Sequence, residues 1–478
     1  MDEYMNKTPS KPKNIYKSNN TPKPKSTPQP GDHVTIICRD NISDESKYKE
    51  YEGILMPNEN TANLVLKLDN GYNIGIERSK IKKINLIKKH NESKTHNSKT
   101  FAGEKISFNN NKPTITILHT GGTIASKVDY ETGGVVARFT PKELLDMFPE
   151  LGAIANIKSR LVRNMWSQDM RFAHYNLLAK EIQQEVKAGV EGIIITHGTD
   201  TLHYTSAALS FILNSLPIPV ILVGAQRSSD RGSSDASFNL ICAAKFIAET
   251  DFADVAICMH ESSDDKSCVI LQGLKCRKMH TSRRDAFKPV NTTAIARVNL
   301  SNIEFINPNY SKKHKNKTDL TENKTNLKIM PFKELIKIGI LTQRTNMYAN
   351  EFLFYKNYSG LIIEATGLGN PPTSQIDTFT KEHKKIFEAI RTLIKKGVVV
   401  AIAPQTIYGR INLNVYSNQR EIKQIGVLGD GCDMTTETAY LKLAWLLSNF
   451  TREEVKKLYE KNIKGEISER TGSEFQVY

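Results

Sequence analysis

Four apolar runs in the middle of the chain, separated by helical patterns, constrain the fold more than any other feature. The runs are "TITIL" (114–118), "GIIIT" (192–196), "VILVGA" (220–225) and "DVAICM" (254–259). Between the first two, residues 174–188 are predicted to be helical, because apolar residues recur four positions apart and Gly189 follows. This order predicts an α/β fold with a mostly parallel sheet that helices cover on both faces.

Polar stretches divide the chain into parts. Short β-rich runs broken by turns such as Asp69-Asn70-Gly71 predict a small SH3-like or Tudor-like β-barrel. Capping boxes predict helices that open at Thr140 and at Thr451. The predicted parts are a disordered basic tail (1–30), the barrel (31–88), a linker (89–112), a larger α/β domain (113–307), a linker or loop (308–330), a smaller α/β domain (331–450) and a C-terminal helix and tail (451–478).

The chain has 478 residues and a formal net charge of +15. A basic surface attracts polyanions such as RNA, but an AT-rich genome, which inflates Lys and Asn, explains the same excess. The six cysteines form no C-x-x-C pair, which argues against a zinc site or a disulfide framework and fits a reducing cytoplasm. No apolar signal core and no run long enough to span a membrane is present in the sequence, so we expect a cytoplasmic protein without a membrane partner.

Polar residues follow the predicted strands at the edge where parallel sheets bind ligands. "HTGGT" (119–123) follows the first strand, "HGTDT" (197–201) the second, and "SQD" (167–169) precedes a helix. A threonine hydroxyl needs a base to become a nucleophile, and a neutral lysine such as Lys278, oriented by an aspartate, can accept its proton. Gly121 and Gly122 let the backbone come close to a ligand, and backbone amides there can stabilise an oxyanion.

Each of these motifs also has a purely structural interpretation. Glycine turns after strands are common, and Thr199 and Asp200 could simply cap a helix. Lys278 on its own is typical of a surface lysine. For His119 and His197 we favour structural roles and predict no catalytic one. The motifs therefore gain weight from occurring together and in order.

Taken together, "ILHTGGTIAS", "SQDM", "ITHGTDT", "GAQRSSDRGSSDASFNL" and "RKMHTSRR" resemble the bacterial-type asparaginase family over roughly residues 113–450. The resemblance implies an asparaginase-like two-domain parallel-sheet catalytic region that hydrolyses the side-chain amide of Asn or Gln through an acyl-enzyme. It implies Thr123 as the nucleophile, a second triad of Thr199, Asp200 and Lys278, and a mobile-loop tyrosine at Tyr130. It also implies substrate binding by Ser167 and Gln168.

A narrower resemblance covers nearly everything except the first 30 residues and the loop near 310–328. "YEGILMP", "LVLKLDNGYNIGI", "YGRINLNVYS" and "IKGEISERT" are similar to the D subunits of archaeal-type glutamyl-tRNA(Gln) amidotransferases. This resemblance implies a heterodimer with an E subunit, a heterotetramer of two D and two E, and a homodimeric core. It implies that Glu-tRNA(Gln) binds mainly through the E subunit.

The same resemblance implies no cofactor in this chain, with ATP and Mg²⁺ at the E subunit. The sequence has no phosphate-binding loop of the G-x-x-x-x-G-K-[ST] type, in agreement with that assignment. Two other hypotheses stay open. One is a free-standing asparaginase with an appended barrel, and the other is a catalytically silent RNA-binding or scaffold protein.

Overall fold

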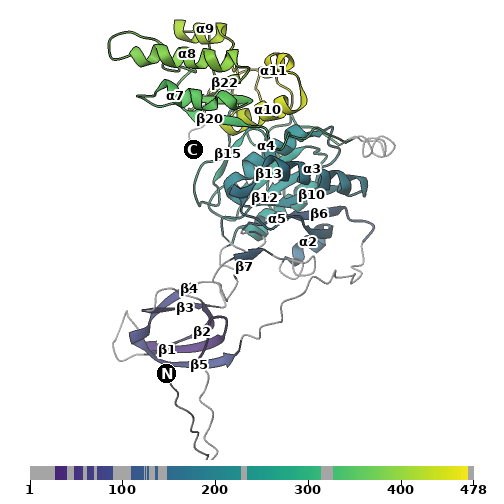
Figure 1. Cartoon of the computed structure of the whole chain (residues 1–478). Coiled ribbons are helices and arrows are strands. Elements are labelled where there is room, and N and C mark those ends of the chain that lie inside the picture. The colour runs from purple at the N-terminus through teal and green to yellow at the C-terminus, as the bar shows by residue number, and fades with distance from the viewer. Residues whose placement is uncertain are drawn as a thin grey trace, which may run out of the picture. The chain divides into compact units, whose positions relative to one another are not determined.

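The structure of the chain is a computed structural model (Figure 1). It describes residues 27–39, 48–56, 62–68, 73–89, 109–122, 124, 126–128, 135–137, 148–227, 234–313 and 327–471. The chain divides into two compact units, one made of residues 1–96 with 130–132 and the other of the remaining residues. Residues 1–26 of the predicted tail and the predicted helix that opens at Thr140 lie outside the described residues.

The N-terminal unit is a five-stranded antiparallel sheet that curls into a small barrel (Figure 1). The strands lie in the order β4-β3-β2-β1-β5. Alternate residues such as Val34 and Ile36 point into its core, where they meet Leu55, Leu66 and Ile76. The predicted small barrel is therefore confirmed. Its strands are β1 (His33–Arg39), β2 (Tyr48–Met56), β3 (Asn63–Lys67), β4 (Asn73–Glu77) and β5 (Ile81–Lys88), with a 3₁₀ turn η1 (Arg78–Lys80) before β5.

The larger α/β domain is built on an eight-stranded sheet in the order β18-β17-β14-β13-β12-β10-β6-β9. The five strands from β13 to β9 are parallel, as the alternating pattern predicts, while β14, β17 and β18 extend the sheet antiparallel. The strands are β6 (Thr114–His119), β9 (Asn156–Leu161), β10 (Gly192–Thr196), β12 (Val220–Val223), β13 (Val255–His260), β14 (Cys268–Gln272), β17 (Ala296–Val298) and β18 (Ile303–Phe305). Three short pairs complete it: β7 (Ser126–Val128) with β8 (Val135–Ala137), β11 (Leu213–Asn214) with β19 (Lys328–Ile329), and β15 (Cys276–Lys278) with β16 (Phe287–Pro289).

Helices cover both faces of this sheet. Ile193 and Leu222 face one cluster with α3 and α4, and Ile194 and Ile221 face the other with α5. Alternate residues of each strand thus pack into the hydrophobic clusters on opposite faces of the sheet, as expected for a buried parallel sheet. Helix α3 begins two residues before the predicted start. The helices are α2 (Pro149–Ile154), α3 (Phe172–Lys187), α4 (Leu202–Ile212) and α5 (Ala236–Glu249), with 3₁₀ turns η3 (Ser167–Asp169) and η4 (Thr199–Thr201).

The smaller α/β domain holds a three-stranded parallel sheet, β20-β21-β22. The predicted capping box at the start of α11 is present, since Thr451 and Glu454 bond each other's backbone N–H groups. The elements are β20 (Ile338–Thr342), α7 (Ala349–Leu353), η5 (Phe354–Asn357), β21 (Gly360–Ala365), α8 (Lys381–Lys395), β22 (Val399–Pro404), α9 (Ser417–Gln424), α10 (Thr436–Asn449) and α11 (Arg452–Leu458).

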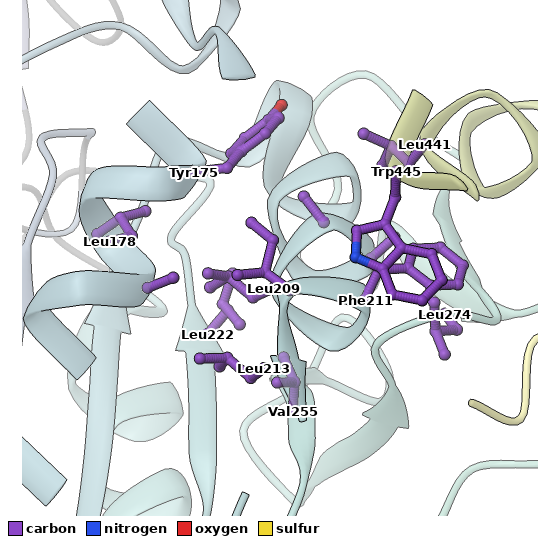
Figure 2. Close-up of a cluster of buried hydrophobic side chains, with 14 of the residues drawn as sticks. Tyr175, Leu178, Leu209, Phe211, Leu213, Leu222, Val255, Leu274, Leu441 and Trp445 are labelled. Carbon is purple, nitrogen blue, oxygen red and sulfur yellow. The ribbon is translucent and has the colours of Figure 1, made fainter. Parts of the chain in front are cut away.

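One hydrophobic cluster joins the two α/β domains. Figure 2 shows Phe211 of α4 beside Trp445 of α10, and their ring centroids are 5.5 Å apart. The Trp445 indole N–H donates to the backbone oxygen of Met330 at 3.1 Å, so the ring buries its polar atom without leaving it unpaired. Helix α10 of the smaller domain is therefore part of the core that supports the larger sheet.

Candidate active site

The carboxyl ends of β6 and β10 meet at Thr120. Its hydroxyl donates to the backbone oxygen of Thr196 at 2.9 Å, and its own N–H donates to the same oxygen at 3.1 Å. Thr120 is only 3% exposed. The first threonine of the "TGGT" motif is therefore a structural residue that ties the two strand ends together.

Positions 121 and 122 require glycine for two reasons: the backbone conformation and the lack of room for a Cβ atom. Their φ angles are +113° and +83°, a region that side chains strongly disfavour. A Cβ on Gly121 would lie 2.4 Å from the backbone oxygen of Met165, and one on Gly122 would lie 2.5 Å from the backbone nitrogen of Gly198. The glycines therefore let the chain after β6 pack against the "MWSQD" and "HGTDT" segments, which brings all three predicted motifs together.

The two motif histidines are structural, as the sequence predicts. His197 is fully buried, with its ring nitrogens 2.7 Å from the Gly198 oxygen and 2.8 Å from the Thr205 hydroxyl. Burial lowers the pKa of His197 to about 4. His119 bonds the hydroxyls of Thr196 and Ser159, and burial lowers its pKa to about 4 as well. Both rings are therefore neutral and fully engaged at neutral pH.

Lys278 joins the two candidate triad residues of the second motif. Its Nζ lies 2.8 Å from the Thr199 hydroxyl and 2.8 Å from Oδ1 of Asp200. The lysine side chain is 10% exposed, whereas the aspartate is 69% exposed. A surface lysine is therefore the wrong interpretation of Lys278, because the β15–β16 hairpin aims its amine at the end of β10.

Helix capping does not explain Thr199 and Asp200 either. Neither η4 nor the helix α4 that follows it has a side-chain cap bond. The structure thus brings Thr199, Asp200 and Lys278 into hydrogen-bond contact, in the geometry that a hydroxyl, a base and an orienting carboxylate require. Their catalytic roles stay predictions.

Ser167 and Gln168 lie on η3 beside the same motif. Ser167 is 5% exposed, and a Cβ on Gly198 would lie 2.9 Å from its hydroxyl oxygen. The Thr201 hydroxyl donates to the Ser167 backbone oxygen at 2.6 Å, which fixes η3 against η4. Gln168 is exposed, so its amide is open to a ligand. Thr123, the predicted nucleophile, and Tyr130, the predicted loop tyrosine, lie outside the described residues.

Two supporting residues have no clear signature in the sequence. The fully buried Asp235 carboxylate accepts the backbone N–H groups of Gln226 and Arg227, each at 3.0 Å. Asn239 donates to the Gly224 backbone oxygen at 3.0 Å. Together they hold the loop after β12 at the same sheet edge. Their one sequence signal is their place at the start of a helix in "SSDASFNL".

We also searched the described residues for metal-binding clusters, thiols and membrane-spanning helices. There, no group of three or more His, Cys, Asp or Glu side chains is arranged to hold a metal ion. All six cysteines are buried and carry free thiols. No helix in the part of the chain that the structure describes is long and apolar enough to cross a membrane.

Three family models match the chain. They are the N-terminal asparaginase domain (residues 114–311), the glutaminase/asparaginase C-terminal domain (337–459) and the GatD N-terminal domain (37–87). Two solved structures share the fold over 75% of the chain at 26% identity. The thermostable L-asparaginase from Thermococcus kodakarensis aligns with a TM-score of 0.63 over 100% of its own length, and L-asparaginase I from Vibrio cholerae with 0.62 over 99%.

Curated relatives match over nearly the whole chain. The D subunit of the glutamyl-tRNA(Gln) amidotransferase of Pyrococcus furiosus is 44% identical over 449 residues, which are 92% of this chain and 95% of that protein. The D subunit of Methanococcus vannielii is 42% identical over 431 residues, 88% of this chain and 95% of its own. The chain therefore belongs to the family of glutamyl-tRNA(Gln) amidotransferase D subunits, whose catalytic region has the asparaginase fold.

Proposed function

We propose that this chain hydrolyses the side-chain amide of glutamine, or of asparagine, and supplies the ammonia to a partner that converts Glu-tRNA(Gln) to Gln-tRNA(Gln). The observation that carries the proposal is the Lys278 amine between Thr199 and Asp200 at the sheet edge, 2.8 Å from each. This arrangement occurs in a chain that matches amidotransferase D subunits over 92% of its length.

In the first half of the reaction, the Thr123 hydroxyl oxygen attacks the carbonyl carbon of the substrate amide. Its proton passes through the Thr199 hydroxyl to a neutral Lys278 amine, and a C–O bond forms. Backbone amides near Gly122 and Gly198 stabilise the oxyanion of the tetrahedral intermediate. Lys278 then returns the proton to the leaving nitrogen, the C–N bond breaks, and ammonia departs from an ester on Thr123.

In the second half, water attacks the ester carbonyl and gives a proton to Lys278. The ester C–O bond breaks, the threonine oxygen recovers the proton, and glutamate or aspartate leaves. We assign the α-groups of the substrate to Ser167, Gln168 and Asp200, since the exposed Asp200 carboxylate suits an α-ammonium group. The role of the family's mobile-loop tyrosine is assigned to Tyr130.

The partner in this proposal is the E subunit of the amidotransferase, in a heterotetramer of two D and two E chains around a homodimeric D core. ATP and Mg²⁺ act at the E subunit, where glutamate on the tRNA is activated, and this chain carries no cofactor of its own. Glu-tRNA(Gln) binds mainly through that partner. The six free thiols of this chain suit the reducing cytoplasm, where we place the reaction.

A free-standing L-asparaginase with an appended barrel is the second candidate. The two L-asparaginase structures that cover 75% of the chain favour it. The first candidate ranks higher because residues 37–87 match the GatD N-terminal domain, which accounts for the barrel as well.

The test is ammonia release from glutamine and asparagine by the purified chain, alone and with the E subunit, ATP, Mg²⁺ and Glu-tRNA(Gln). Strong stimulation with formation of Gln-tRNA(Gln) is the expected result. Rapid release by the chain alone, unchanged by the additions, would identify an asparaginase. Thr123→Ala should abolish release, while Thr378→Ala, a change at an exposed threonine of the smaller domain, should leave it unchanged.

A further inference from the structure

The N-terminal barrel has a basic edge that amide hydrolysis does not explain. Residues 78–91 contain six Lys or Arg and no Asp or Glu. Strand β5 stands at one end of the sheet order, next to β1 only among the described strands (Figure 1). Along it Lys82, Lys83 and Lys88 are exposed, and so is Lys89 just after it. The barrel therefore presents a row of ammonium groups along one strand.

Among the described residues of the barrel, few carboxylates oppose this row. The described part of the barrel holds nine basic residues, namely Arg39, Lys49, Lys67, Arg78, Lys80, Lys82, Lys83, Lys88 and Lys89. It holds four acidic ones, Asp32, Glu50, Glu52 and Glu77. Asp32 is 5% exposed, and Glu77 is paired with Lys80 at 2.8 Å. Residues 78–91, which include β5, are therefore strongly positive, which favours a polyanionic partner.

An exposed aromatic ring stands at one end of the basic row. Tyr48 is 43% exposed, and the Lys82 ammonium lies 4.2 Å from its ring centroid. Arg39, which is also exposed, is the cross-strand partner of Tyr48 in the β1–β2 ladder. A partly open ring flanked by two cations is the combination that binds nucleic acids, because the ring stacks on a base while the cations meet phosphates.

Roles unrelated to nucleic acid account for only part of these observations. Lysines on an edge strand prevent edge-to-edge association, but that role needs neither Tyr48 nor Arg39. An AT-rich genome raises the lysine content everywhere and does not concentrate it on one strand. Leu86 and Ile87, 36% and 48% exposed, would also suit an anionic membrane, so vesicles form a separate arm of the test.

We propose that the basic edge, defined as Arg39, Tyr48, Lys82, Lys83 and Lys88, binds tRNA, with the cations on backbone phosphates and Tyr48 stacked on an unpaired base. The inference rests on the proposed function, in which tRNA is a substrate of the assembly. It adds a contact made by this chain to those made through the partner, and it gives the barrel a role apart from amide hydrolysis.

The test uses the full chain without the partner and uncharged tRNA(Gln) as the probe, with affinity measured from about 0.05 to 0.2 M salt. Replacing Lys82, Lys83 and Lys88 with Gln should weaken binding about tenfold or more and flatten the log–log salt slope by about three. Replacing the same lysines with Arg keeps the charge and should preserve binding. Tyr48→Ala should weaken binding at least about fivefold, with little change in the slope.

The matched control replaces three exposed lysines of α8, Lys381, Lys384 and Lys395, with Gln. This variant has the same net charge as the barrel variant and should bind tRNA like the unaltered chain. Equal weakening in both variants, or no tRNA binding by the unaltered chain, would overturn the proposal. Tighter binding to phosphatidylserine vesicles than to tRNA, or loss of binding to the E subunit with tRNA affinity unchanged, would overturn it as well.

Ammonia release separates this inference from the proposed function. All barrel variants should hydrolyse glutamine like the unaltered chain, because none of the substituted residues belongs to the candidate active site. If tRNA binds through the basic edge and no ammonia is released under any condition, the proposed function fails alone. If ammonia and Gln-tRNA(Gln) form and the barrel variants bind tRNA normally, the basic-edge inference fails alone.

Discussion

Replacing Lys278 with Met should separate activity from stability in a single variant. The Lys278 amine is 2.8 Å from both Thr199 Oγ1 and Asp200 Oδ1, so the change removes the proton acceptor of the proposed mechanism. A positioned general base contributes about 10²–10⁴-fold to rate, and kcat/KM for glutamine should fall by that factor.

The stability of the same variant should hardly change. Asp200 is 69% exposed, and ion pairs with a solvent-exposed partner contribute about 0–1 kcal/mol. For domains of 150–250 residues, 1 kcal/mol moves the Tm by about 2–4 °C, which sets the upper limit here. The methionine side chain also fits a site where the lysine is only 10% exposed.

Two further variants sharpen this measurement. Lys278→Arg places an always-protonated guanidinium at this position, which cannot accept a proton, so it should be as inactive as the Met variant if the lysine is a base. Lys266→Met removes another Lys–Asp pair, 2.8 Å long, whose lysine is 85% exposed, and should leave both rate and Tm unchanged. The reasoning fails if Lys278→Met retains more than about a tenth of kcat/KM, or if its Tm falls by more than about 5 °C.

Three other predictions concern the framework. Gly122→Ala places a methyl group 2.5 Å from the Gly198 nitrogen at φ +83°, so ammonia release should fall at least about 100-fold and the Tm should drop. Lys442→Met leaves the Glu466 carboxylate buried without its cation, which should cost about 3–5 kcal/mol in urea unfolding, and Glu466→Gln in the same chain should restore part of it. The buried His119 has its pKa lowered from 6.5 to about 4, so the unfolded chain takes up a proton first. The contribution of His119 to stability should therefore fall by up to about 3 kcal/mol as the pH drops from 6.5 to 4, and His119→Gln should remove that part of the pH dependence.

Local patterns in the sequence predict the elements that position the site. The runs of β6, β10 and β12 mark strands because their side chains are buried on both faces, which makes each run rich in Ile, Val or Leu. The apolar spacing of α3 and the capping box of α11 are likewise local features. The antiparallel strands β17 and β18 could not be predicted in this way, because each is three residues long and carries no periodicity.

Contacts between distant residues also have no local pattern. Lys278 and Thr199 are 79 positions apart, and only the resemblance to a family placed them in one site. The buried pair of Lys275 with Asp433, at 2.8 Å, spans 158 positions and has no local signature. Whether a lysine lies on the surface or in a buried pair depends on the packing of separate elements, and the sequence around it does not reveal this.

The smaller domain contributes directly to the geometry of the candidate active site. The Glu437 carboxylate of α10 lies 3.1 Å from Arg277 Nε and 3.8 Å from His203 Nε2. Arg277 precedes Lys278 on β15, and His203 follows Thr199–Thr201 at the start of α4. Burial acts to raise the pKa of Glu437, but His203 and Arg277 outweigh it and lower the pKa to about 2, so the carboxylate is charged.

The Glu437 carboxylate of the smaller domain thus lies next to both Arg277 and His203. These residues belong to β15 and α4, and the positions of these two elements decide whether Lys278 reaches Thr199. An unpaired charge is costly for a carboxylate that is 8% exposed, so Glu437 favours the arrangement in which Arg277 and His203 both face it. The larger domain therefore depends on α10 for more than the apolar contacts of Phe211 and Trp445. The distance between the Lys278 amine and the Thr199 hydroxyl therefore depends on the packing of both domains, and not on the larger domain alone.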